Sequence, residues 1–285
     1  MMFFDGFTLD ESGPIRMRSG GSGPPLLLLH GYPQTHAMWN AVAGRLADRF
    51  TLICPDVSPH RLEAALSSDM LSLMSRLGHE SFGVAGHDLG GHVACRMALD
   101  AASRVVRLAT LEIVPVPEHM NRADMAYSLA GYPNCWFGQL HPLPEALATK
   151  APAQWFGADA GGGEAGFFHP EAVADYLRAA ARLNDRPEDG LPSDSRAASP
   201  RPVEAGHRLR LNCPVLAIWG SRGRIGGWYD PLQLWRECVD NEVSGGAVPA
   251  GHFLAEERPD MIAAAFRDFF VGNRLPPQPS QNRAA

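Results

Sequence analysis

Short apolar runs alternate with helical patterns along most of this 285-residue chain, and this alternation constrains the fold more than any other feature. The apolar runs have the length and the Leu, Val and Ile content of core strands, and they lie at 25–31, 50–57, 81–88, 106–114 and 214–221. Helical patterns bounded by turn residues lie at 61–77, 91–101, 231–240 and 259–271. Strands joined by crossover helices form a mostly parallel sheet with helices on both faces. The sequence therefore predicts an α/β fold with a mostly parallel, doubly wound sheet, completed by an opening hairpin at 3–18 and a last strand at 243–249.

The alternation stops midway along the chain, where a long stretch rich in Pro, Gly and Ala carries shorter helical patterns. Such an interruption within a sheet domain is typical of an inserted helical lid. We expect a core domain made of residues 1–114 and 213–272, with residues 115–212 forming the lid. The tail at 273–285 has the composition of a disordered end.

Composition and charge narrow the class of protein. Hydrophobic residues make up 45% of the chain and charged residues 20%, which is enough apolar material for a large core. The net charge of −6 is spread along the sequence without a Lys/Arg cluster, so nucleic-acid binding is not expected. The chain starts with neither a basic segment nor an apolar run of signal-peptide length, so we expect a soluble, cytoplasmic protein without membrane association. The five cysteines are far apart and form no C-x-x-C pair, so neither disulfides nor a metal site are expected.

The stretch VAGHDLGGH, residues 84–92, places an acid between small residues where the chain passes from a strand into a helix. In a doubly wound sheet such a turn lies at the carboxyl edge, where ligands bind. The pattern from Gly86 to Gly90 is a nucleophile elbow with aspartate in place of serine. It predicts that Asp88 projects into an active site and that the amide of Leu89 points into the same space. The alternative, that Asp88 only caps the helix, leaves the flanking glycines unexplained.

Three further residues lie where such an elbow needs partners. Tyr32 follows the first parallel strand in LHGYP, and its amide is the second expected oxyanion donor. His252 lies in a loop between the last strand and the last helix, where the general base is expected, and Glu112 ends the strand at 106–114 as the acid able to orient it. The alternatives are a salt-bridged Glu112 and a structural His252. The predicted catalytic residues are therefore Asp88, Glu112 and His252.

Taken together, these motifs resemble the α/β-hydrolase superfamily, and within it the branch of haloacetate dehalogenases and epoxide hydrolases. The resemblance is carried by HGYPQTHAMW, GHDLGGHVACRMALD, LEIVP, PVLAIWGSRG and GHFLAEERP, which extend from about residue 20 to residue 271. It implies an α/β-hydrolase fold and a displacement in two steps that needs no cofactor. Asp88 attacks an electrophilic carbon to form an alkyl ester, and a water activated by His252 then hydrolyses that ester.

Two positions beside the nucleophile depart from the family. Fluoroacetate-type members carry one arginine directly after the nucleophile and another three residues further on, and together these hold the substrate carboxylate. Here those positions are Leu89 and His92. The loop after Asp56 and Val57 is also shorter than in relatives, which is expected to widen one wall of the pocket. Both departures argue against small halo-acids and favour a neutral, bulkier electrophile.

The lid positions that hold halide in the family have also changed. An ungapped placement puts Pro133, Asn134 and Ser195 at the halide donors, and a shift of two residues restores Trp136 as one donor. Opening an epoxide requires a proton for the departing oxygen, and Tyr132 is the lid hydroxyl that we predict to supply it.

The predicted substrate-contacting residues are His92, Trp39, Tyr132 and Trp136, for which packing inside the protein is the alternative. The sequence favours a hydrolase with an aspartate nucleophile that acts on a neutral electrophile, with epoxide hydrolysis preferred over dehalogenation of haloacids or haloalkanes. A non-hydrolytic cyclase, dehydratase or isomerase of secondary metabolism is an alternative of a different class, and a binding protein with a vestigial site is another. The expected partner is a small-molecule substrate, and a homodimer stays open.

Overall fold

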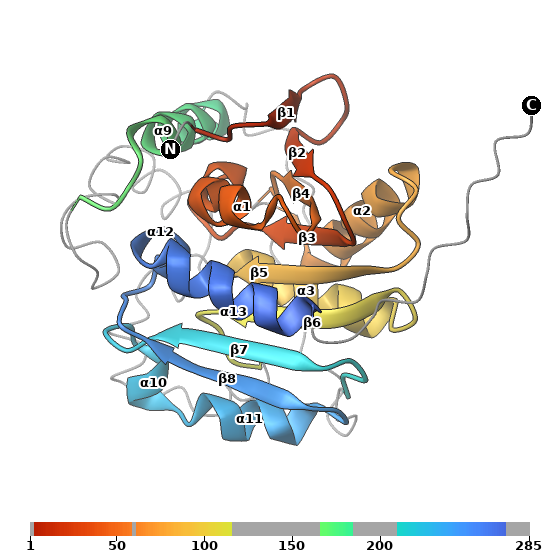
Figure 1. Cartoon of the computed structure of the whole chain (residues 1–285), viewed down its shortest axis with the longest axis vertical. Coiled ribbons are helices and arrows are strands. Elements are labelled where there is room, and N and C mark those ends of the chain that lie inside the picture. The colour runs from red at the N-terminus through yellow and green to blue at the C-terminus, as the bar shows by residue number, and fades with distance from the viewer. Residues whose placement is uncertain (1–2, 59–60, 116–165, 185–209, 272–285) are drawn as a thin grey trace, which may run out of the picture.

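The computed structural model describes residues 3–58, 61–115, 166–184 and 210–271, which form one sheet with helices on both faces (Figure 1). The strands, in chain order, are β1 (Phe7–Asp10), β2 (Met17–Gly21), β3 (Pro25–Leu29), β4 (Thr51–Pro55), β5 (Phe82–His87), β6 (Val105–Leu111), β7 (Val215–Gly220) and β8 (Val243–Val248). The sheet order is β1-β2-β4-β3-β5-β6-β7-β8. The pairs β1/β2 and β2/β4 are antiparallel, and every other pair is parallel. The predicted mostly parallel, doubly wound sheet is confirmed.

Both faces of this sheet are buried, and strand β3 explains how. Leu26 and Leu28 belong to one hydrophobic cluster, whereas Leu27 and Leu29 belong to another. Successive side chains on a strand point to opposite faces, so an unbroken run of leucines suits a strand that is covered on both sides. The four leucines are at most 1% exposed, which agrees with this arrangement.

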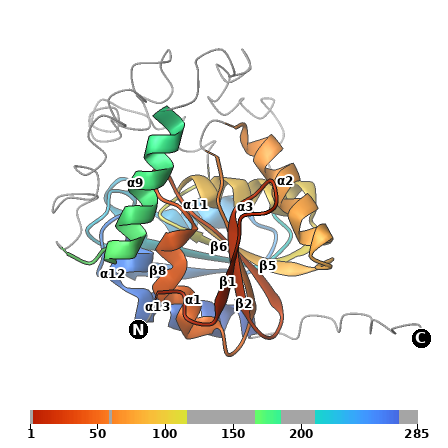
Figure 2. The same cartoon turned by 90° about the horizontal axis from the view of Figure 1, so that it is seen from above.

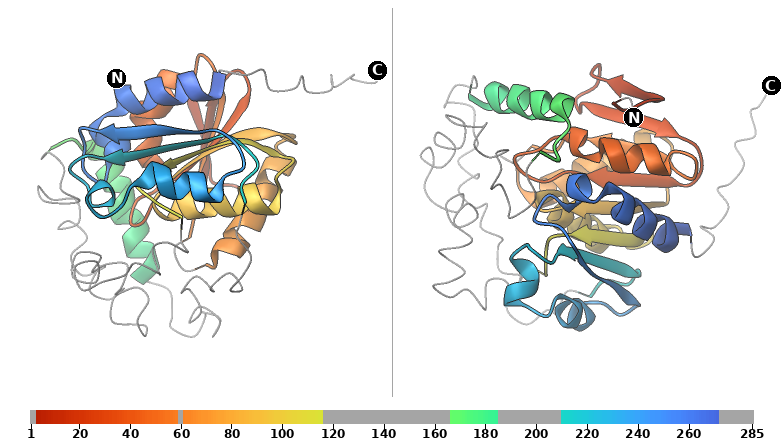
Figure 3. Two further views of the ribbon diagram at one scale, coloured as in Figure 1. Left: turned by 90° about the horizontal axis from the view of Figure 1, so that it is seen from below. Right: turned by 60° about the vertical axis from the view of Figure 1, so that its left-hand side comes forward.

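The covering helices divide between the two faces. The described helices are η1 (His36–Trp39), α1 (Asn40–Leu46), α2 (Glu63–Arg76), α3 (Leu89–Asp100), α9 (Pro170–Asn184), α10 (Ile225–Trp228), α11 (Pro231–Cys238), α12 (Leu254–Glu257) and α13 (Pro259–Val271). Helices α1, α12 and α13 pack against the face that carries Leu26, and α2, α3 and α11 against the opposite face. Figure 3 shows these two layers from below and from the side.

The sequence analysis located α2, α3, α11 and α13 to within a few residues, but it gave no bounds for α9 and missed the short helices. The helix predicted at 259–271 coincides with α13. The helix predicted at 61–77 corresponds to α2, which is a few residues shorter. Helices α1, α10 and α12 were not predicted, because helices of one or two turns leave little periodicity to detect. Helix α3 begins at Leu89 rather than at residue 91, so glycines occupy its first turn.

Of the predicted lid at 115–212, the structure describes 166–184 and the two short ends of the range. Helix α9 lies in this segment and packs against η1, above the carboxyl edge of the sheet (Figure 2). Its Ala172 and Tyr176 are buried against the core. The predicted lid residues Tyr132, Pro133, Asn134, Trp136 and Ser195, and the tail at 273–285, lie outside the described residues.

Candidate active site

Asp88 occupies the turn between β5 and α3 in a conformation that side-chain-bearing residues rarely adopt. Its φ is 48° and its ψ is −120°. The chain can turn this sharply because glycines stand two positions before and two positions after Asp88: a Cβ on Gly86 would lie 2.1 Å from the carbonyl oxygen of Gly90. A Cβ on Gly90 would lie 2.4 Å from the carbonyl oxygen of Leu29. The glycines around Asp88 are therefore required by close backbone contacts, as expected for a nucleophile elbow.

The two oxygens of the Asp88 carboxylate have different surroundings. The backbone amide of Tyr32 donates to Oδ1 at 3.2 Å, and the amide of Leu89 also bonds to the carboxylate. The other oxygen, Oδ2, lies 4.0 Å from Nε2 of His252. One oxygen is therefore held by backbone, while the other faces an imidazole across a short gap.

The charges in this group suit a nucleophile beside a base. Burial alone would raise the pKa of Asp88, but His252, His87 and the amide of Leu89 outweigh it and hold that pKa below its ordinary value. Burial lowers the pKa of His252, and the nearby Arg224 adds to this, against the opposing effect of Asp88. At neutral pH, Asp88 is therefore ionised, and His252 is uncharged and able to accept a proton.

Glu112 follows β6 and has a positive φ of 56°, like Asp88 at the end of the neighbouring strand. Its Oε2 accepts a hydrogen bond of 2.8 Å from the amide of Gly220, and the amide of Ile225 also donates to the carboxyl group. Burial raises the pKa of Glu112 to about 8 despite these two bonds. No hydrogen bond or ion pair joins Glu112 to His252 in the described part of the chain. Glu112 thus anchors the loop between β7 and α10, and its role in orienting His252 stays a prediction.

The other predicted contacts divide between the site and the core. His92 lies in the first turn of α3, where its amide donates to the carbonyl of Asp88 at 3.2 Å, and its ring helps lower the pKa of Asp88. Trp39 is fully buried and packs against Phe266 of α13, with ring centroids 6.2 Å apart. The prediction that Trp39 contacts substrate is wrong, because η1 turns this side chain into the core beneath α13.

Comparison with known proteins supports the family assignment. A family model described as alpha/beta hydrolase fold matches residues 24–140. A fluoroacetate dehalogenase from a Burkholderia species is 31% identical, over 95% of this chain and 96% of that protein. The chain belongs to the α/β-hydrolase family. A soluble epoxide hydrolase from Corynebacterium sp. (strain C12) is 29% identical to this hydrolase, over 89% of this chain and 92% of that protein.

Solved structures agree with this assignment. A crystal structure from Nostoc sp. PCC 7120, assigned to the α/β hydrolases, superposes on the hydrolase with a TM-score of 0.81. It is 35% identical and covers 94% of this chain and 98% of its own. The structure of the epoxide hydrolase CorEH, 28% identical, has a TM-score of 0.74 and covers 94% of this chain and 99% of its own.

Helix α9 of the hydrolase is tied to the core by polar contacts that the sequence analysis missed. Tyr176 donates to Oε1 of Glu256 at 2.9 Å, and the side chain of Gln34 donates to the other oxygen of that carboxyl group. Gln34 belongs to the turn that carries Tyr32, and Glu256 lies one helical turn after His252. Helix α9 is therefore bonded to both segments that carry candidate active-site residues. In the sequence, these contacts are indicated only by the polar residues Gln34 and Glu256, which follow shortly after Tyr32 and His252.

A second set of contacts fixes the same helix. Arg16 donates to both carboxylate oxygens of Asp175, at 2.8 and 3.0 Å, and Thr35 donates to Asp175 at 2.6 Å. A bidentate Arg–carboxylate pair has little rotational freedom, so it fixes orientation as well as position.

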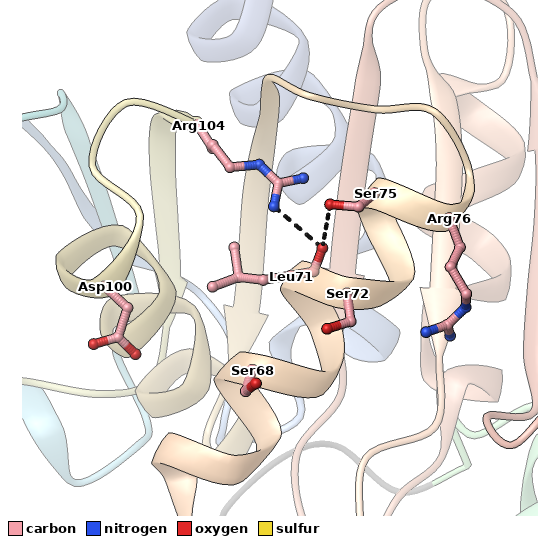
Figure 4. A pocket seen from close by; sticks show the side chains of 7 residues that line it. All are labelled: Ser68, Leu71, Ser72, Ser75, Arg76, Asp100 and Arg104. Carbon is pink, nitrogen blue, oxygen red and sulfur yellow. Dashed lines mark hydrogen bonds between the residues drawn. The ribbon is translucent and has the colours of Figure 1, made fainter.

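A hollow of about 450 Å³ lies on the hydrolase surface, lined by Ser68, Leu71, Ser72, Ser75, Arg76, Asp100 and Arg104 (Figure 4). It lies at the amino edge of the sheet, since α2 ends just before β5 begins, whereas Asp88 lies at the carboxyl edge. Ser75 and Arg104 both donate to the carbonyl of Leu71, at 3.1 and 3.2 Å, so they cap the end of α2 (Figure 4). This hollow is separate from the candidate active site.

Two classes of feature are absent from the described ranges. No group of three or more His, Cys, Asp or Glu side chains there could hold a metal ion. Among the helices described, none is long and apolar enough to cross a membrane.

Proposed function

We propose that this hydrolase uses Asp88 as a nucleophile on a neutral electrophile, an epoxide, and that His252 then activates the water that hydrolyses the resulting ester. The observation that carries the proposal is the difference between the two oxygens of Asp88. The amide of Tyr32 holds Oδ1, the amide of Leu89 also bonds to the carboxylate, and Oδ2 lies 4.0 Å from Nε2 of His252. If Asp88 only capped helix α3, its carboxylate would need contacts to backbone amides alone, and the neutral imidazole that faces Oδ2 would be unexplained.

The proposed reaction has two steps, formation of an ester on Asp88 and its hydrolysis. Oδ2 of Asp88 attacks an epoxide carbon, the ring C–O bond breaks, and the departing oxygen takes a proton, for which Tyr132 is the proposed donor. His252 then removes a proton from water, and the water oxygen attacks the carbonyl carbon of the ester. The oxyanion formed is stabilised by the amides of Tyr32 and Leu89. Collapse of this intermediate breaks the ester C–O bond, and the departing oxygen takes the proton held by His252. The second proton of the water returns to Tyr132, which leaves a diol and the Asp88 carboxylate with one oxygen from water.

The choice of substrate rests on the residues beside Asp88. Leu89 and His92 stand where a carboxylate clamp would need two arginines, and loss of each charged hydrogen bond weakens binding by about 1.5–3 kcal/mol. His92 is half-buried one turn along α3 and is a proposed substrate contact, as is Trp136. Dehalogenation is the second candidate, because the Burkholderia relative is a fluoroacetate dehalogenase.

The test uses His252→Gln with styrene oxide and, separately, with chloroacetate. We expect the variant to be alkylated and then to stall, so that a mass adduct accumulates on the peptide containing Asp88. An epoxide adduct retains every atom of the epoxide, whereas a haloacid adduct lacks the halogen, so the mass identifies the chemistry. Asp88→Asn is the matched control and should show no adduct.

Single turnover of the wild type in H₂¹⁸O provides the second arm. Label in the Asp88 carboxylate supports an ester intermediate. Absence of label during turnover of either compound, together with an unmodified His252→Gln variant, would refute the covalent mechanism. Fluoride or chloride release from haloacids at rates above epoxide opening would favour dehalogenation instead.

A further inference from the structure

His87, the last residue of β5, is completely buried beside the nucleophile. Its Nε2 lies 2.8 Å from the carbonyl oxygen of His252, and the two rings lie 4.7 Å apart between centroids, tilted by 55°. A carbonyl oxygen can only accept, so Nε2 of His87 carries the hydrogen and donates it. The residue next to the nucleophile is thus bonded to the backbone of the base.

The other side of the His87 ring meets the oxyanion turn. A Cβ on Gly31 would lie 2.7 Å from Nδ1 of His87 and 2.7 Å from Cβ of Asp88, so the turn packs closely on this ring. Nδ1 is buried and has no hydrogen-bond partner in the described part of the structure. The ring therefore lies between the turn that carries Tyr32 and the loop that carries His252.

The loop of His252 has further anchors just before this residue. Arg222 donates to the carbonyl of Pro249 at 2.9 Å, and the carboxylate of Glu257 accepts from the amide of Gly251 at 2.9 Å. These contacts fix the residues that precede His252. The bond from His87 acts on His252 itself.

Burial lowers the pKa of His87 to about 3, and the neighbouring His252 adds to the effect. His87 is therefore neutral under the conditions in which His252 works as a base. A neutral donor holds the loop without placing a positive charge beside an imidazole that must itself become protonated.

We propose that His87 is a positioning residue that aligns His252 for ester hydrolysis by donating from Nε2 to the His252 backbone carbonyl. The inference rests on the proposed base role of His252. It predicts different effects on the two steps of the reaction, formation of the Asp88 ester and its hydrolysis. Attack by Asp88 needs the elbow, its amides and an ionised carboxylate, and His252 and the amide of Leu89 still favour ionisation when His87 is replaced. Activation of water needs the His252 ring in one orientation, and that orientation depends on the loop.

The experiment compares His87→Phe, which keeps a ring and removes the donor, with His87→Gln, which keeps a donor in a smaller side chain. Single-turnover measurements with styrene oxide give the rates at which the Asp88 ester forms and decays. We expect His87→Phe to slow ester decay about tenfold, the effect of one lost hydrogen bond, while ester formation stays within about threefold of the wild type. His87→Gln should recover part of the decay rate.

Thr110→Val is the matched control. Thr110 is buried in β6 in register with Gly86, and its hydroxyl has no hydrogen-bond partner among the described residues. This variant removes a buried polar group from the neighbouring strand and should change neither rate. An equal slowing of both steps by His87→Phe, or a decay rate in His87→Gln no better than in His87→Phe, would overturn the proposal.

A measurement without substrate separates this inference from the proposed function. In ¹⁵N-histidine NMR spectra, the slowly exchanging Nε2 proton of His87 should disappear in His87→Phe, and the ring signals of His252 should shift. Those His252 signals should return toward their wild-type positions in His87→Gln and stay unchanged in Thr110→Val. If no tested compound alkylates Asp88, the proposed function fails, while the NMR spectra still test whether His87 positions His252. Unchanged His252 signals in His87→Phe would refute that positioning role.

Discussion

The buried carboxyl group of Glu112 predicts that the free energy of unfolding falls as the pH rises through neutrality. In the folded protein, burial raises the pKa of Glu112 to about 8, from an ordinary value of 4.5. The folded state therefore binds this proton more tightly than the unfolded chain does. The stabilisation is fully present below about pH 4.5 and is lost as the pH rises toward about 8.

The size of the effect follows from the difference between the two pKa values. Subtracting 4.5 from about 8 gives about 3.5 pH units, and each unit corresponds to about 1.4 kcal/mol, so Glu112 contributes at most about 5 kcal/mol. The group is only 5% exposed, so solvent screening reduces the figure little. Glu112→Gln removes the titration and keeps an oxygen that can accept from the amide of Gly220.

The assay is urea unfolding of the wild type and Glu112→Gln at pH 5 and pH 8.5. We expect the wild type to lose about 3–5 kcal/mol more than the variant over this interval. Glu256 also has a pKa raised by burial to about 8, but it titrates in both proteins and cancels in the difference. Glu242→Gln, at an exposed position, is the matched control and should follow the wild type.

Equal losses of stability in the wild type and Glu112→Gln would show that Glu112 does not keep its proton in the folded state. The activity of the same variant tests the other role predicted for this residue. If Glu112 orients His252 as an anion, the amide should slow turnover by about 10⁴-fold, as such a change does in a protease triad. If Glu112 is a neutral anchor of the β7–α10 loop, turnover should stay within about tenfold of the wild type, a range set by the loss of a hydrogen bond.

Two further predictions concern the lid. Tyr132→Phe should lower epoxide turnover by about 10²-fold, the usual contribution of a general acid, with little change in thermal stability; unchanged diol formation would exclude Tyr132 as the acid. Asp175→Asn should destabilise the hydrolase by about 1.5–3 kcal/mol in urea unfolding, the contribution of a charged hydrogen bond, because it breaks the bidentate pair with Arg16 while Arg16 keeps its contacts to Glu11 and Asp56. Asp240, which pairs with Arg210 at an exposed position, provides the control, because Asp240→Asn should lower the free energy of unfolding by about 1 kcal/mol or less. An equal loss of stability in both variants would contradict a role for Asp175 in docking α9.

The elbow could be predicted from the sequence because its requirements are local. Close approaches at Gly86 and Gly90 leave no space for a Cβ, and the sequence reports this directly as two glycines around an acid. The strands could be predicted for a related reason, since two covered faces require unbroken apolar runs.

Other parts of the site depend on contacts between residues far apart in the chain. Trp39 belongs to a motif of this family, but whether its ring points toward the pocket or the core is determined by α13, where Phe266 packs on it. Glu112 could be predicted to end a strand at the carboxyl edge. Its hydrogen-bond partner could not, because the amide of Gly220 lies 108 residues further along the chain.

Asp88 and Glu112 end adjacent strands, both with positive φ, and the register of β5 and β6 pairs His87 with Leu111 just before them. Two carboxylates placed so close together oppose each other's ionisation, and the charge of Asp88 contributes to the raised pKa of Glu112. The surroundings separate the two groups: Asp88 has two amides and faces His252, whereas Glu112 is buried and accepts from the amides of Gly220 and Ile225. A pair of acids whose pKa values are pushed apart divides the chemistry between them. The ionised member is the one able to attack, and the neutral member leaves the imidazole of His252 to interact with the attacking carboxylate and with water.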